Sequence, residues 1–317
     1  MTLSKEKVSA FVSKYSMYLI LVGMIIIMSV LKGENFNTWN NYRNIIRQMT
    51  PIGIMALGVT FCIITEGTDL SGGSVIAMCS VVAAHMAHPG EFSLIVTILV
   101  TVLAGILAGS INGAVIAYGK VPPFIATLGM MSAARGAAML LSDGKPISNF
   151  SGGFKFIGGG SIGIVPMPVI VFAICCIIAY ILLQKTKYGA YIYAIGGNEN
   201  AAIVSGVNVK SIKMSAYALA GMFTAIGAIV LTARQESGQP QMGVGYDMEA
   251  ITCAIIGGTS FSGGIGTISG TIVGALIMGV LANGMTMLQV NPNWQMVVKG
   301  VVIVLAVLLD MYKNRKK

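Results

Sequence analysis

The chain has 317 residues, of which 55% are hydrophobic and only 10% are charged. A soluble domain usually carries about a quarter charged residues, so a water-facing surface for a chain of this length cannot be built from so few. Mean hydropathy is +0.82, and residues 93–108 contain no charge at all. The composition excludes an ordinary soluble protein and predicts an all-α, polytopic membrane protein.

The net charge of +9 comes from 20 basic and only 11 acidic residues. In a soluble protein such an excess would suggest nucleic acid, but here the basic residues lie between apolar segments. Their expected role is to orient the chain in the lipid membrane, and no nucleic-acid partner is expected. The cysteines all lie in apolar runs without CxxC spacing, which favours buried small hydrophobes over disulfides or a zinc site. They are Cys62, Cys79, Cys175, Cys176 and Cys253.

Ten apolar segments are predicted to span or enter the membrane, of which the second and eighth are short. They cover residues 15–31, 51–66, 71–87, 93–118, 122–141, 167–184, 211–233, 247–258, 267–287 and 294–310. The first follows three lysines but lacks a small-residue cleavage site, so we expect an uncleaved span rather than a signal peptide. No soluble domain is evident between the segments. Residues 1–317 are therefore expected to form a single membrane domain.

The loops predict the orientation. With the N-terminus inside, twelve lysines and arginines lie in inside segments and six in outside segments, while Arg135 and Lys299 lie within spans. Positive residues favour the cytoplasmic side, so we expect both termini in the cytoplasm. The long loop 142–166 is then outside, and the long loop 185–210 is inside.

An internal repeat is visible in the glycine-rich turns. Residues 66–74 read EGTDLSGGS and residues 257–265 read GGTSFSGGI, with five identities at an offset of 191. Each copy follows a short predicted segment and precedes another, which predicts broken helices beside a transport pathway. The alternative is two glycine-rich turns that are alike by chance. The candidate pathway residues are Thr68, Asp69, Ser71, Gly72, Gly73, Thr259, Ser262, Gly263 and Gly264.

Nucleotide, metal and catalytic patterns fail on context. Residues 158–163 match GxGxxG but follow no predicted strand, and residues 113–120 have the wrong spacing for a phosphate loop. His85 and His88 are one helical turn apart without acidic or cysteine neighbours, so a metal site is not expected. No nucleophile elbow is present. The sequence therefore predicts no catalytic residue, no metal and no cofactor.

Charged residues at membrane depth are functional candidates because an unpaired charge is costly there. Those within or bordering spans are Glu66, Asp69, Arg135, Asp247, Glu249, Lys299 and Asp310. We expect Arg135 and Lys299 to neutralise buried acids, Asp69 to cap the third segment, and Asp310 to lie at the inner interface.

Glycines recur every fourth residue in two segments, which predicts close helix packing. The two series are Gly105, Gly109 and Gly113, and Gly266, Gly270 and Gly274.

Five separated motifs resemble one known family. They are GTDLSGGS (67–74), PPFIATLGMM (122–131), YIYAIGGNENAAIVSGV (191–207), YDMEAITCAIIGGTSFSGG (246–264) and NPNWQMVVKG (291–300). These motifs are similar to permeases of bacterial ABC importers for monosaccharides, of the ribose and methyl-galactoside types. The resemblance implies an inner-membrane location and three partners. These are a second permease subunit that completes a homodimer, an ATPase that hydrolyses ATP, and an extracytoplasmic sugar-binding protein.

The resemblance also implies an ATPase-coupling helix in the inside loop, with an E-A-A…G pattern. Asn198, Glu199, Asn200, Ala201, Ala202 and Gly206 occupy that pattern, although Asn200 replaces its first alanine. Two alternatives remain open. One is an autoinducer or nucleoside ABC permease, and the other is an ion-coupled secondary transporter that would use Glu66, Asp69 or Asp247.

Overall fold

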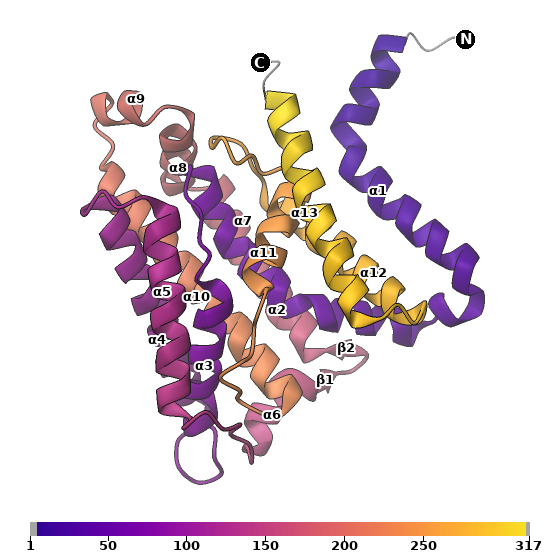
Figure 1. Ribbon diagram of the computed structural model, residues 1–317, viewed down its shortest axis with the longest axis vertical. Helices are drawn as coiled ribbons and strands as arrows, with labels where there is room; N and C mark the ends of the chain where they lie inside the picture. The colour runs from indigo at the N-terminus through magenta and orange to yellow at the C-terminus, as the bar shows by residue number, and fades with distance from the viewer. Residues whose placement is uncertain (1–4, 315–317) are drawn as a thin grey trace.

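The structure is a computed structural model that describes the backbone of residues 5–314 and the side chains of residues 16–312. This part of the chain forms thirteen helices and one short hairpin (Figure 1). The helices are α1 (Lys5–Phe36), α2 (Trp39–Ile64), α3 (Gly72–Met86), α4 (Leu94–Ala117), α5 (Pro123–Leu141), α6 (Gly152–Gly159), α7 (Met167–Gln184), α8 (Lys187–Gly197), α9 (Glu199–Val204), α10 (Val209–Gln235), α11 (Tyr246–Ile256), α12 (Ile268–Met287) and α13 (Pro292–Asn314). Strands β1 (Ser161–Ile162) and β2 (Val165–Pro166) pair antiparallel.

Eight helices of the described chain, rather than ten, are long and apolar enough to cross a membrane. They are α1, α2, α4, α5, α7, α10, α12 and α13. The other two predicted spans are α3 and α11, which have only 15 and 11 residues. A crossing needs about 20 residues, so α3 and α11 reach across only together with the irregular backbone beside them.

Helix α2 is longer than predicted. Thr38 caps it by accepting a hydrogen bond from the backbone N–H of Asn41 (3.1 Å), and the helix continues for 26 residues through Pro51. The predicted short segment at 51–66 is therefore only its C-terminal half. The N-terminal half was missed because it contains several polar residues; buried Asn41, for example, accepts a hydrogen bond from Asn283 of α12 (3.0 Å).

The predicted glycine packing is present between α4 and α10. A β-carbon at Gly105 would collide with the carbonyl oxygen of Gly221, and one at Gly109 with that of Tyr217. The second series is only partly helical, because Gly266 lies in the turn before α12. Gly270 and Gly274 of α12 pack directly on the backbone of α11 and the residue after it. Small residues thus let backbones approach where lipid provides no hydrophobic driving force.

The two ends of the molecule differ in what they carry. Helices α8 and α9, the start of α1 and the end of α13 lie at one end, whereas α6 and the hairpin lie at the opposite end (Figure 1). This arrangement agrees with the grouping of loops predicted from the basic residues.

Candidate transport and coupling site

The first glycine-rich turn, residues 65–71, is fixed by a buried polar network. The Asp69 carboxylate accepts hydrogen bonds from the backbone N–H and the hydroxyl of Ser71 (2.9 and 2.6 Å). Asn112 of α4 donates to the same hydroxyl (3.0 Å), and all three side chains are buried. The prediction that Asp69 caps α3 is wrong, because the capping position of α3 is Ser71. Asp69 instead stabilises the turn before α3 through an Asx-type hydrogen bond from its side chain.

The second glycine-rich turn, residues 257–267, meets the first. The backbone N–H of Gly264 donates to the carbonyl of Ile64 (2.9 Å), the last residue of α2. Gly263 and Gly264 have φ values of 75° and 68°, a region that glycine adopts without strain. The two copies of the repeat therefore converge at the C-terminus of α2. The short segment expected before each copy is present only for α11, because α2 is long.

Asp310 of α13 also belongs to this second turn. Its carboxylate accepts hydrogen bonds from the hydroxyl of Ser260 (3.1 Å) and the backbone N–H of Phe261 (3.0 Å). The sequence interpretation placed Asp310 at the membrane interface beside the basic tail and missed these bonds. No sequence pattern joins positions fifty residues apart, so only the fold could reveal them.

The nine candidate pathway residues are mostly enclosed by protein. Ser262 is exposed, and Thr68 and Gly264 are half-buried. The buried ones are Asp69, Ser71, Gly72, Gly73, Thr259 and Gly263. Most of these residues therefore lie where helices pack closely against one another.

Arg135 of α5 does not form the predicted ion pair within the described structure. Its guanidinium donates to the carbonyls of Pro240 (2.6 Å), Met242 (3.0 Å) and Gly73 (3.4 Å). Residues 236–245 are non-helical and run along α3, so the carbonyls of Pro240 and Met242 are not part of a helix. Irregular backbone at membrane depth needs such internal donors, so Arg135 stabilises the break between α10 and α11.

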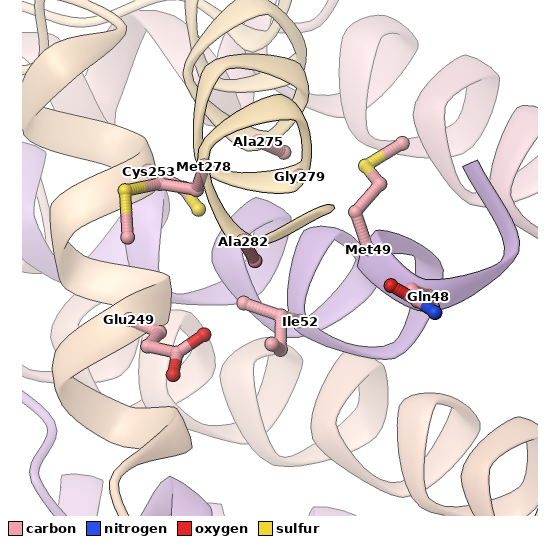
Figure 2. Close-up of a pocket in the computed structure, with 9 residues that line it drawn as sticks. All are labelled: Gln48, Met49, Ile52, Glu249, Cys253, Ala275, Met278, Gly279 and Ala282. Atoms are coloured by element: carbon pink, nitrogen blue, oxygen red, sulfur yellow. The ribbon is translucent and has the colours of Figure 1, made fainter. Parts of the chain in front are cut away.

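Lys299 of α13, in contrast, pairs with an acid. Its ammonium donates to the carboxylate of Glu249 of α11 at 2.6 Å, and both side chains are mostly buried. Glu249 also lines a pocket between α2, α11 and α12, and Figure 2 shows its carboxylate pointing into that space. The pocket is lined by Gln48, Met49, Ile52, Glu249, Cys253, Ala275, Met278, Gly279 and Ala282.

The predicted coupling helix is α9. The Asn198 side chain caps it by accepting from the backbone N–H of Ala201 (2.9 Å). Ala202 is buried against α8 and α10, whereas Val204 is 89% exposed. Gly206 ends the helix with φ 81° and donates to the carbonyl of Ile203 (2.9 Å), a conformation suited to glycine. The helix thus has one face anchored and one small apolar face open.

The Glu199 carboxylate is held within the chain. It pairs with Lys213 of α10 at 2.5 Å, so part of its charge is neutralised before any partner binds. Asn200 and Ala201 are exposed beside it. Lys213 was counted in the sequence only as an orienting charge.

Helix α8 joins this coupling region to the glycine turns. The Tyr193 hydroxyl donates to the carbonyl of Gly266 (2.7 Å). A β-carbon at Gly196 would collide with the carbonyl oxygen of Ile64, so the end of α8 touches the end of α2 without intervening side chains. Helix α8 therefore contacts the chain at the place where the two turns meet. Sequence analysis did not single out Tyr193, although it lies in one of the quoted motifs.

The two histidines form hydrogen bonds with the backbone, and the cysteines are mostly buried. His85 and His88 each bond a backbone carbonyl, of Leu141 (2.7 Å) and Asn149 (3.0 Å) respectively. Among the described residues, no group of three or more His, Cys, Asp or Glu side chains is placed to hold a metal ion. The five cysteines are free thiols, and four of them are buried.

These features define a class: a multi-pass, mainly helical membrane protein with two glycine-rich breaks that meet beside a short helix at one end of the molecule. The chain belongs to the family described as "Branched-chain amino acid transport system / permease component", whose model matches residues 41–307.

Curated relatives cover almost the whole chain. The ribose import permease protein RbsC of Bacillus subtilis is 43% identical, over 95% of this chain and 94% of that protein. RbsC of Haemophilus influenzae is 39% identical, over 99% of this chain and 98% of that protein. The galactose/methyl galactoside import permease protein MglC of Escherichia coli K12 is 36% identical, over 99% of both. A solved ABC transporter structure in an inward-facing conformation covers 93% of this chain and 94% of its own, with 16% identity and a TM-score of 0.47.

Proposed function

We propose that this chain is the permease subunit of an ABC importer that carries a monosaccharide across the bacterial cytoplasmic membrane. The family and the names of the relatives, which import ribose and galactose, support this assignment. The chain itself is not an enzyme, and ATP hydrolysis belongs to a partner ATPase. An extracytoplasmic binding protein delivers the sugar. A second copy of the chain completes the membrane assembly, and residues 1–317 act as one permease domain with both termini in the cytoplasm.

The observation that carries the mechanism is the contact of α8 with both glycine turns. The open face of α9 docks on the ATPase, and Asn198, Glu199, Asn200, Ala201, Ala202 and Gly206 form this coupling region. When the ATPase closes, α9 moves together with α8 and the start of α10, because Ala202 is packed against both of these helices. Tyr193 and Gly196 pass that movement to the turns that join α2 to α3 and α11 to α12.

In this mechanism the nine pathway residues, which lie in the two turns and at the start of α3, act as hinges, and the Asp69–Ser71–Asn112 hydrogen bonds hold the first turn in position. Arg135 and Lys299 hold the break before α11 and the attachment of α13, respectively. Because protein groups satisfy the charges of Arg135 and Lys299, both residues have a structural role in transport.

Reconstitution tests this function. The chain is placed in proteoliposomes with its ATPase, and radiolabelled ribose is supplied with the binding protein. We expect uptake that requires ATP hydrolysis and that survives collapse of ion gradients. Sugar uptake by the chain alone, driven by a sodium or proton gradient, would instead establish the ion-coupled transporter. Competition by nucleosides or autoinducer, but not by ribose or galactose, would establish the other ABC alternative.

A further inference from the structure

Helix α2 carries a stripe of carboxamides on its exposed face. Within Trp39–Ile64 the exposed positions are Trp39, Asn40, Asn44 and Gln48, and every one after Trp39 is a carboxamide. Spacing of four residues places these side chains in a row along one face of the helix. We call Asn40, Asn44 and Gln48 the carboxamide stripe.

The stripe descends into the membrane-spanning part of the molecule. Gln48 lies nine residues beyond the start of α2, which is about 14 Å along the helix. Asn40 lies at the start of the helix, but exposed amides at Asn44 and Gln48 would be costly against lipid tails, because nothing there can satisfy their donors and acceptors. The stripe is therefore suited to face water rather than lipid.

The stripe ends at the pocket of Figure 2. Gln48 lines that pocket, and so does Ile52, the next position in the four-residue series. Across from them lies Glu249, with one carboxylate oxygen bonded to Lys299 at 2.6 Å. A carboxylate has a second oxygen that can accept further hydrogen bonds. Met49, Ile52 and Met278 supply apolar walls.

The chemistry of this surface suits a small polyhydroxylated ligand. Each sugar hydroxyl both donates and accepts hydrogen bonds, and carboxamides offer both functions in one group. The sugar's C–H faces are matched by apolar side chains, as in many binding sites that combine a mostly apolar lining with a few polar groups. The candidate pathway residues at the glycine turns offer no comparable surface, because six of the nine are buried.

We propose that the carboxamide stripe and the Gln48–Glu249 pocket line the first part of the path along which the sugar crosses the membrane. The inference rests on the proposed function and deepens it, because it assigns the sugar path to residues other than those of the glycine-rich turns. The stripe leads the sugar inward by exchanging hydration for amide hydrogen bonds, and the pocket is the innermost polar contact before the packed half of α2. Contacts of this kind lower the barrier without holding the sugar tightly.

Cysteine accessibility tests this path. Gln48→Cys is compared with Leu103→Cys, since each is the tenth residue of its helix and each is exposed, but Leu103 lies in an apolar stretch of α4. Both variants are first required to retain ATP-driven ribose uptake. A membrane-impermeant methanethiosulfonate is then applied to right-side-out and inverted vesicles. Because the reaction needs a hydrated thiolate, we expect Gln48→Cys to be modified at least about tenfold faster.

The same vesicles report transport. Modification of Gln48→Cys should block ribose uptake, while reagent-treated wild type, with only its native thiols, should continue to transport. Equal modification rates for Gln48→Cys and Leu103→Cys would overturn the path, as would disulfide cross-linking of Gln48→Cys between two copies with no reagent access. Should Gln48→Cys fail the uptake requirement, Asn44→Cys takes its place with Leu99→Cys as control. Absence of ATP-driven uptake by the wild-type complex would contradict the proposed function itself, so the two failures are distinguishable.

Discussion

At the residue scale, Tyr193 is the side chain with the clearest predicted effect on coupling. Its hydroxyl bonds Gly266, whereas Tyr191, two residues earlier on α8, is exposed. Loss of one such hydrogen bond costs about 1 kcal/mol, or about fivefold in an equilibrium. We expect Tyr193→Phe to reduce the number of sugar molecules imported per ATP hydrolysed about fivefold, and Tyr191→Phe to leave it unchanged.

Sugar uptake and ATP hydrolysis are measured in the same proteoliposomes, and co-purification of the ATPase serves as the control for docking. Tyr193→Phe should retain the ATPase, because α9 is untouched. An unchanged ratio of sugar to ATP in Tyr193→Phe would show that the contact with Gly266 does not transmit movement.

The outcome at Arg135 shows what the sequence alone could not give at this scale. A lone arginine within a span indicates a buried charge that must be satisfied. Whether its partners are carboxylates or carbonyls depends on where residues 236–245 lose their helical bonds, and that is settled by packing on α3. Lys299 does form the expected pair with an acid, because Glu249 lies on α11, the helix against which α13 packs.

At the element scale, the contact of α4 with α10 should be the least tolerant of added volume. A β-carbon at Gly109 collides with the Tyr217 backbone, whereas one at Gly129 of α5 meets nothing within 4 Å. Overpacking costs about 1–3 kcal/mol, while alanine in an open helical position gains up to about 1 kcal/mol over glycine. We expect Gly109→Ala to lower the Tm of the purified permease and Gly129→Ala to leave it equal or higher.

Thermal unfolding in detergent compares the two variants directly. A Tm for Gly109→Ala at or above that of Gly129→Ala would mean that the two helices can separate without penalty. The close approach would then have no role in holding the bundle together.

Helix α9 gives a second prediction at this scale. Reversing the charge of Glu199 would also break its pair with Lys213, so the exposed Val204 is the cleaner position. A carboxylate placed on an apolar docking face must be desolvated on binding. We expect Val204→Asp to reduce co-purification of the ATPase by at least about tenfold. Ile164→Asp, in the turn of the hairpin at the opposite end and 70% exposed, should leave co-purification unchanged. Equal retention of the ATPase by both variants would contradict docking on α9.

At the scale of the whole molecule, the sequence predicted the fold class and the two glycine turns, and eight of its ten predicted spans are helices long and apolar enough to cross a membrane. Periodicity and hydropathy are local quantities, so they locate apolar helices such as α4 and α7 well. The predicted third and eighth segments, 71–87 and 247–258, end within two residues of α3 and α11, but these local quantities cannot show that the polar start of α2 is helical. The meeting of the two turns at Ile64 is a long-range contact, which only the folded chain provides.

The orientation of the molecule is the last prediction. The structure places α8 and α9 at one end and α6 with the hairpin at the other (Figure 1), and the basic residues favour the α8–α9 end as cytoplasmic. Ser148 and Ser205 are exposed near these opposite ends. With a membrane-impermeant maleimide on intact cells, we expect labelling of Ser148→Cys and none of Ser205→Cys until the membrane is permeabilised. The native cysteines are mostly buried and give the background level. Labelling of Ser205→Cys alone in intact cells would reverse the orientation and place the coupling helix on the side that lacks ATP, which the importer function does not allow.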